Sequence, residues 1–444
     1  MNKLAVNIIL GILLLPMTVL AQETTPTETK PPAASITLDV KTAVKMAGEH
    51  SYSLQGTALD LTTQRNAAQG SFSLFYPSAS LSGTFQMGSN EAAGTVADAN
   101  KLSVGASVGV SLTPVMALQV KQLWNAYQAG QLTYEQARAK LAVAVKKYYY
   151  GLILSRDQLD LLRKQADAAS QRLKTAEYKL SLGLIAPVDK LSVEYAYKNA
   201  LYALKSAENT YRINLLQLLQ VCGIDGSADV TLSDGIPNAP ALPAGTDTTA
   251  VADNIDLRLL QVNKNAAEIQ RDIAVTSLLP VVTLSVEAGR AYQIDPFSQS
   301  LFSGGDWAAT GSAALKFAIN VPLDSYLPYS GAWQTLAAKD AALRQAELSI
   351  MDKTETARQQ AETDVLTLQQ IESQLESLAV NIQMAEQNLT LIEQLYNSGK
   401  KSFLDVKDAE NSAFSARVQL ANAKYNYIAA LLDLGYLLNR DFGY

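Results

Sequence analysis

Apolar residues follow a three-and-four spacing through two long segments of the chain. In the first segment the steps run through Leu159, Leu162, Ala166, Ala169, Leu173, Ala176 and Leu180. An apolar residue every 3.5 positions keeps one stripe of a helix facing a partner helix, as in a coiled coil. The pattern predicts two long helices, over 115–182 and 330–397. Each would be roughly 100 Å long at a rise of about 1.5 Å per residue.

The second segment repeats the first after an offset of 216 residues. The matching positions are Leu375, Leu378, Ile382, Ala385, Leu389, Ile392 and Tyr396. Gly183 then matches Gly399, and each glycine is expected to end its long helix. A further helix should follow each glycine, over 187–222 and 402–438. The chain is therefore an internal duplication. Residues 36–222 are predicted to form the first repeat, 251–444 the second, and 223–250 the linker.

Ahead of each long helix the apolar period changes to two. Six apolar residues alternate with serine and glycine before the first helix: Leu102, Val104, Ala106, Val108, Val110 and Leu112. A similar alternation covers 307–321, and two earlier strands are expected from Tyr76 and from Leu279. Such alternation is typical of a transmembrane β-strand, although strands of a soluble sandwich would also show it. Segments 88–100 and 290–306 are expected to be loops that join these strands.

Four strands are too few to close a membrane barrel, since the smallest have about eight. An open sheet edge cannot face lipid, because its backbone N–H and C=O groups would remain unpaired. The pattern therefore favours a barrel shared by several copies of the chain and continued by long helices.

The first residues, MNKLAVNIILGILLLPMTVLAQ, have the pattern of a secretory signal peptide. Lys3 precedes an apolar core over 8–15, and small residues lead to Ala21. We expect residues 1–21 to be a signal peptide cleaved after Ala21, with 22–35 as a flexible leader. The alternative is an N-terminal membrane anchor. No later segment offers the roughly 20 unbroken apolar residues of a spanning helix.

Composition excludes several classes of function. A net charge of −6 over 444 residues gives no indication of nucleic-acid binding, which needs a concentrated basic face. The chain has one cysteine, Cys222, and one histidine, His50. They are too few for a structural zinc site. We therefore expect no enzyme activity, no metal and no cofactor.

Two segments resemble a known family: LGLIAPVDKLSVEYAYKNALYALKSAEN in the first half and YNSGKKSFLDVKDAENSAFSARVQLANAKYNYI in the second. They resemble the TolC-like outer-membrane factors, the exit ducts of tripartite efflux pumps and type I secretion systems. The resemblance implies an α+β membrane protein of the cell outer membrane. Three chains would give four strands each to a 12-stranded barrel, and the helices would form a periplasmic α-barrel.

The resemblance also implies partners. These are two further copies in a homotrimer, outer-membrane lipid, a periplasmic adaptor protein and an inner-membrane transporter of the RND, ABC or MFS type. The alternative that the helices alone would allow is a periplasmic coiled-coil scaffold without a pore. In that case the strand segments would be soluble in water.

By position, the resemblance assigns roles at the helix reversals. Asp405 and Asp408 correspond to the acidic pair that forms carboxylate rings at the periplasmic constriction. Asp189, Tyr396 and Lys401 correspond to a latch between the two reversals. The family often has arginine in place of Lys401, and lysine lacks the bidentate geometry of arginine.

The turns at the reversals, formed by Gly183, Leu184 and Gly399, correspond to the surface on which the adaptor docks. Each of these features also has a purely structural explanation. Ser402 and Asp405 have the spacing of a helix capping box, and glycine commonly ends a helix in the left-handed conformation.

Overall fold

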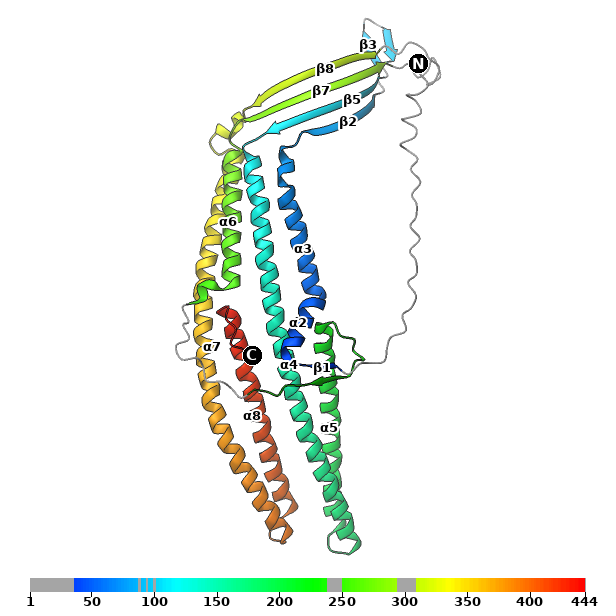
Figure 1. The fold of residues 1–444 in the computed structure, drawn as a ribbon, viewed down its shortest axis with the longest axis vertical. Coiled ribbons are helices and arrows are strands. Elements are labelled where there is room, and N and C mark those ends of the chain that lie inside the picture. The colour runs from blue at the N-terminus through cyan, green and yellow to red at the C-terminus, as the bar shows by residue number, and fades with distance from the viewer. Residues whose placement is uncertain are drawn as a thin grey trace.

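The computed structural model describes residues 36–86, 89–92, 95–98, 101–237, 250–293 and 309–443. The molecule is elongated, with a curved sheet at one end and long helices running away from it (Figure 1). The expected signal peptide, the cleavage site after Ala21 and the leader lie outside the described residues. Within the described ranges, no helix combines the length and apolar character needed to cross a membrane.

The main sheet contains the four predicted strands. They are β2 (Ser78–Gln86), β5 (Lys101–Leu112), β7 (Val281–Gln293) and β8 (Ala309–Asn320). The order is β2–β5–β7–β8, with every neighbouring pair antiparallel. The central pair β5–β7 joins the two repeats, with Val108 opposite Val286. Apolar side chains such as Leu315 and Phe317 are exposed along β8.

One predicted loop contains strands. Within 88–100, β3 (Ser89–Ala92) pairs with β4 (Thr95–Asp98) in an antiparallel hairpin. Strands of four residues are too short to show a convincing alternation of apolar and polar residues, so the sequence pattern could not separate them from a loop. The first part of the other predicted loop, up to Gln293, belongs to β7.

The predicted helices occur with bounds close to those expected. The long helices are α4 (Val115–Ser181) and α7 (Gly331–Asn397), and the helices after the turns are α5 (Pro187–Cys222) and α8 (Phe403–Leu437). The helices that precede the strands are α2 (Val40–His50), α3 (Tyr52–Gln69) and α6 (Ile255–Thr276). The described residues also contain short 3-10 helices, which are η1 (Gly70–Phe75), η2 (Ala250–Asp253) and η3 (Leu323–Tyr326).

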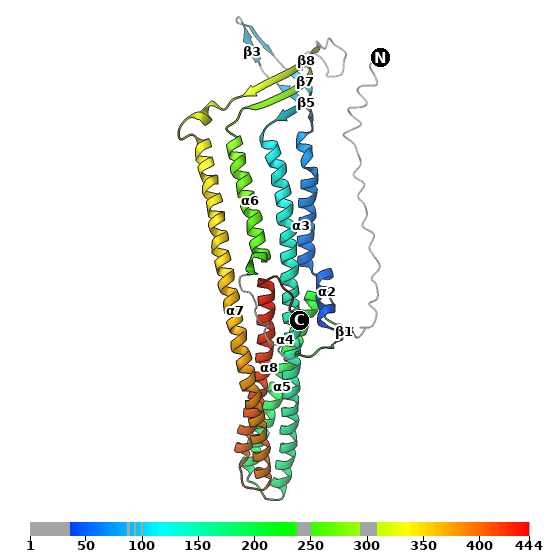
Figure 2. The same cartoon turned by 60° about the vertical axis from the view of Figure 1, so that its left-hand side comes forward.

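Each long helix has one shorter partner toward the sheet and another toward the far end. Helices α3 and α6 run beside the sheet-proximal parts of α4 and α7, whereas α5 and α8 run beside their distal parts (Figures 1 and 2). The chain turns back at the far end twice. We name α4–α5 the first tip hairpin and α7–α8 the second tip hairpin.

The main apolar core lies near the middle of α4. Tyr149, Leu152 and Ile153 of α4 are fully buried there together with Leu218 and Leu219 of α5. A second, smaller core packs α7 against α8 around Leu368 and Leu434. Both cores sit well away from the tips, where smaller residues such as Ala176, Val193 and Ala409 are buried within the tip hairpins.

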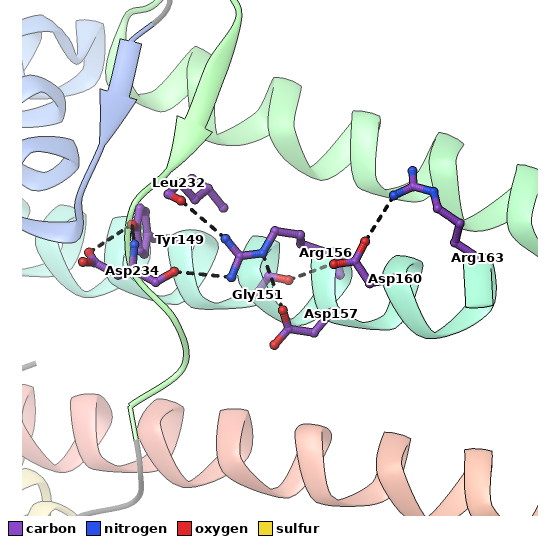
Figure 3. A network of polar contacts seen from close by, with 9 residues as sticks. Tyr149, Gly151, Arg156, Asp157, Asp160, Arg163, Leu232 and Asp234 are labelled. Carbon is purple, nitrogen blue, oxygen red and sulfur yellow. Dashed lines mark hydrogen bonds and ion pairs between the residues drawn. The ribbon is translucent and has the colours of Figure 1, made fainter. Parts of the chain in front are cut away.

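The predicted linker is partly structured. Its strand β6 (Val230–Leu232) pairs in parallel with β1 (Ile36–Leu38). The Tyr149 hydroxyl lies 2.9 Å from the Leu38 carbonyl oxygen and 3.0 Å from the Asp234 carboxylate. The Arg156 guanidinium donates to the Leu232 and Asp234 carbonyls, each at 3.4 Å (Figure 3). These contacts fasten the linker to α4.

Candidate functional site at the helical tip

The two tips end in equivalent turns. Gly183 and Gly399 have φ values of +72° and +74°, the left-handed conformation that glycine adopts without strain. The N–H of Gly183 donates to the Leu180 carbonyl at 2.9 Å, and the N–H of Gly399 donates to the Tyr396 carbonyl at 2.9 Å. In both turns the N–H of the next residue donates to the helix carbonyl five positions earlier, from Leu184 to Lys179 and from Lys400 to Leu395, which completes a Schellman cap.

Asp405 caps the start of α8. Its carboxylate accepts from the Ser402 N–H at 2.9 Å and from the Ser402 hydroxyl at 2.8 Å. The Lys401 ammonium lies 3.3 Å from the same carboxylate. The Ser402 N–H, the Ser402 hydroxyl and then the Lys401 charge hold the pKa of Asp405 below its usual range. The structural explanation offered by the sequence, a capping box, is therefore correct for Asp405.

Asp408 lies one turn further into α8 and is exposed. Its backbone carbonyl accepts from the Ser412 hydroxyl at 2.8 Å. Since positions three apart lie on the same face of a helix, Asp405 and Asp408 present their carboxylates on one side of α8. The arrangement is compatible with the predicted constriction.

Asp189 occupies in the first tip hairpin the place that Asp405 has in the second. Its carboxylate accepts from the Ala186 N–H at 3.2 Å. Ala186 stands where the second repeat has Ser402, so the Asp189 N–H has no side-chain acceptor here and donates to the Ala186 carbonyl at 3.0 Å instead.

The three predicted latch residues do not bond to one another in the single chain. Asp189 and Tyr396 line the same cleft between the tip hairpins. Lys401 is paired with Asp405, and the Lys179 ammonium lies 5.5 Å from the centre of the Tyr396 ring. Among the hydrogen bonds of the described residues, none joins Asp189 to Tyr396 or Lys401. The latch remains a prediction.

The cleft has a volume of about 1260 Å³ and lies between the two tip hairpins. Apolar side chains from both hairpins line it, including Val188, Leu191, Phe403 and Val406. Lys179 and Lys407 add positive charge to its walls. The cleft therefore lies between the two tip hairpins over part of their length.

One cluster of charged side chains at the upper end of this cleft was not predicted from the sequence. The Arg172 guanidinium of α4 binds the Glu410 carboxylate of α8 through both terminal nitrogens, and its Nη2 lies 3.3 Å from Glu393 of α7. Burial disfavours the charged form of Arg172, but the two carboxylates outweigh it and raise its pKa above the ordinary value. No local sequence pattern marks these residues, because Arg172 and Glu410 are separated by 238 positions.

The open sheet, the two long helices and the paired tips together define a class of fold, that of the outer-membrane channel proteins. The CmeC outer-membrane channel of Campylobacter jejuni matches with a TM-score of 0.77 at 14% identity, over 90% of this chain and 85% of that one. CusC matches with a TM-score of 0.75 at 17% identity, over 93% and 96%.

The chain belongs to the outer membrane efflux protein family, whose model matches residues 43–224 and 248–440. Among curated relatives, outer membrane protein TolC of Salmonella enteritidis is 22% identical over 315 residues, which is 69% of this chain and 62% of TolC. The alkaline protease secretion protein AprF of Pseudomonas aeruginosa is 25% identical over 306 residues, 66% of this chain and 60% of AprF.

Family membership confirms four predictions from the sequence: the TolC-like resemblance, the fold class, the outer-membrane location and the absence of an enzymatic function. The two matched segments fall in the two halves of the duplication. The matched region spans less than two thirds of the length of each of these two relatives, 62% of TolC and 60% of AprF.

Proposed function

We propose that this protein is the outer-membrane exit channel of a tripartite efflux pump or a type I secretion system. It would carry solutes passively across the periplasm and the outer membrane. The observation that carries the proposal is the four-stranded sheet, which has two open edges and continues directly into helices that end at a narrow tip.

The sheet supports a shared barrel. Strands β2 and β8 each have one neighbour within the described part of the chain, so one edge of each is open. Unpaired backbone groups in hydrocarbon are costly by several kcal/mol each. Three copies would supply twelve strands, close the barrel and remove both edges. The exposed apolar side chains Leu315, Phe317 and Ile319 of β8 suit contact with lipid and argue against a soluble scaffold.

Two unpaired helix faces support the homotrimer. On α5 the apolar residues that are exposed, lie away from the cleft and share one face are Tyr202, Ile213 and Leu216, whereas the exposed Leu201 lies on another face. On α7 the exposed apolar residues after Trp333 are Leu348, Met351, Leu366, Val380, Met384 and Leu391. At about 100° per residue, each set lies within an arc of roughly 80° on its helix. We name them the α5 stripe and the α7 stripe.

Figure 1 shows α5 and α7 on opposite sides of the distal end of the protomer, with α4 and α8 between them. A ring forms when one flank of each copy packs on the other flank of the next copy. In the proposed trimer the α5 stripe of one copy therefore packs against the α7 stripe of its neighbour.

The tip provides the gate. Three copies would bring six carboxylates of Asp405 and Asp408 around the channel axis. Their mutual repulsion opposes the local effect of Ser402 and Lys401 on Asp405 and favours a bound cation. Asp189, Tyr396 and Lys401 would form the latch that the partners release.

The turns at Gly183, Leu184 and Gly399 are exposed at the end of the molecule and would receive the hairpin of a periplasmic adaptor protein. The adaptor would link the channel to an inner-membrane transporter. The relatives include a channel and a protease secretion protein by name, which is compatible with either kind of assembly.

Single-channel recording tests the proposal. The purified protein in a planar bilayer should conduct, prefer cations and be blocked by multivalent cations at its periplasmic side. Asp405→Ala combined with Asp408→Ala should abolish the block and the cation preference, because the acidic ring is lost. Asp160→Ala, which removes an exposed carboxylate on α4 far from the turns, serves as the control.

Failure of the wild-type protein to conduct would contradict the channel. Conduction with an unchanged block in the double variant would contradict only the assignment of the constriction.

A further inference from the structure

The cleft between the tip hairpins exposes large apolar side chains. Val188 and Leu191 of α5 and Leu404 of α8 line it and are 65%, 63% and 64% exposed in the single chain. A hollow apolar surface bordered by polar groups is typical of a ligand-binding site. The cleft volume of about 1260 Å³ leaves room for a drug-sized molecule, because ordinary ligand pockets measure roughly 300–1,000 Å³.

Aromatic rings on both walls of the cleft favour a ligand that itself contains rings. Tyr195 of α5, Tyr396 of α7 and Phe403 of α8 line the cleft. The Tyr195 side chain is 65% exposed, so much of its ring is open to a ligand. Aromatic rings that stack offset or edge to face attract each other beyond the effect of the buried area. The cleft therefore suits a planar aromatic body.

The lining of the cleft carries more positive than negative charge. Five charged side chains line it, three of them cationic and two anionic: Arg172, Lys179, Lys407, Asp189 and Glu393. The Glu393 carboxylate is already paired with Arg172, whose Nη2 lies 3.3 Å from its Oε1. The Asp189 carboxylate accepts from the Ala186 N–H at the start of α5. Both acidic groups therefore have a partner within the chain.

Two lysines of the lining have no carboxylate partner in the described part of the chain. The Lys179 ammonium lies 5.5 Å from the centre of the Tyr396 ring, and no described carboxylate forms a salt bridge with it. The same holds for the Lys407 ammonium. Lys179 belongs to α4 and Lys407 to α8, so they lie on opposite walls. Since Arg172 of α4 is level with Glu410 of α8, the two lysines are offset by about four residues, roughly 6 Å along the helices.

We propose that the cleft binds a small organic anion with an aromatic ring body. The rings lie among the apolar and aromatic side chains, and the acidic group lies between Lys179 and Lys407. Burial of the rings supplies most of the affinity, and the two ammonium groups select an anion over a neutral molecule of the same shape. The inference does not depend on the proposed channel, because it concerns only binding to the cleft.

Protection of an introduced thiol tests the site in the full-length oligomer, held in lipid nanodiscs. Ser192 is exposed and lines the cleft, so Ser192→Cys places a reactive thiol on its wall. Ser181 is exposed at the end of α4 and is not part of the lining, so Ser181→Cys is the matched control. The native Cys222 is fully buried, and burial raises its pKa to about 11, so it contributes little labelling in either variant.

Anilinonaphthalenesulfonate is the probe, and N-phenylnaphthylamine is its neutral counterpart, with the same rings and no sulfonate. The sulfonate should slow maleimide labelling at position 192 severalfold and saturably, and should leave position 181 unchanged. The concentration that gives half protection should be about fivefold higher for the neutral amine, the effect of losing partly exposed ion pairs.

The lysines are tested in the Ser192→Cys background. Lys179→Gln combined with Lys407→Gln should weaken protection by the sulfonate to the level of the neutral amine, because both ammonium groups are lost. Lys174→Gln, which removes an exposed lysine of α4 outside the cleft, is the matched control and should leave protection unchanged.

Equal protection by the two compounds, or full protection after the loss of both lysines, would overturn the proposal, since the cleft would then bind by apolar contact alone. A thiol at position 192 that is unreactive without a ligand would also overturn it, because a neighbouring copy of the chain would then fill the cleft. Equal protection at positions 192 and 181 would refute a site confined to the cleft. None of these outcomes depends on whether the protein conducts.

Discussion

Tyr149 connects three parts of the chain through one buried hydroxyl. The ring is fully buried in the main core, and the hydroxyl reaches the Leu38 carbonyl of β1 and the Asp234 carboxylate of the linker. The Asp234 carboxylate also accepts from the Val40 N–H at 3.1 Å, at the start of α2. Burial, and after it the nearby Asp234 carboxylate, raises the pKa of Tyr149 to about 12.

Tyr149→Phe should lower the thermal stability of the helical part by about 1–3 kcal/mol, because buried acceptors lose their donor. Tyr148→Phe, at an exposed neighbouring position, should have little effect. The folded pKa of Tyr149 lies above the unfolded value near 10, so its contribution is complete below pH 10 and is lost as pH rises toward 12. Melting curves between pH 9 and about pH 12 should therefore converge for wild type and variant. Equal stability at pH 9 would contradict this account.

The residues described above fall into two groups, those whose contacts are with residues close by in the sequence and those whose contacts are with residues far away in the sequence. The glycine turns and the Asp405 cap involve residues within six positions of one another, and the sequence pattern located them. The contacts of Tyr149 and Arg172 join residues far apart in the chain. Their partners could not be identified without the fold.

At the scale of single elements, helix ends were the most predictable feature. Helix α5 ends at Gly223 with φ +69°, and the turn places His50 of α2 close by. A Cβ on Gly223 would lie 2.4 Å from the His50 Cβ, whereas a Cβ on Gly183 would meet nothing within 4 Å. The two glycines share the same conformation and differ in their surroundings.

Gly183→Ala should destabilise its hairpin by about 1–2 kcal/mol, the cost of the left-handed conformation for a residue with a Cβ. Gly223→Ala should destabilise the protein more, because the added Cβ also displaces α2. Thermal unfolding followed by circular dichroism would compare the two variants. An equal loss of stability in both variants would show that the close approach of His50 to Gly223 does not contribute to the effect.

At the scale of the whole molecule, the proposed assembly depends on the outer flanks of the protomer. The proposed contact between the α5 stripe and the α7 stripe makes stability depend on other copies of the chain. Tyr202, in the α5 stripe, is 77% exposed in the single chain, and Leu184, at the turn, is 68% exposed.

Tyr202→Glu should lower the temperature at which the trimer dissociates, because it buries a charge against the apolar α7 stripe. Leu184→Glu adds the same charge at a similarly exposed apolar site outside the stripe and should leave that temperature unchanged. Semi-native electrophoresis after graded heating would measure both. Identical dissociation of the two variants would place the interface elsewhere.

The sequence by itself determined the duplication, the four strands of the main sheet and the long helices with their glycine turns. These features depend on apolar periods and on caps, which act between residues a few positions apart. Only the tertiary structure decided the β1–β6 pairing, the β5–β7 junction between the repeats and the partners of Arg172. Each of these joins segments whose local patterns carry no information about one another, because the energy of the contact arises only after the helices and strands have packed.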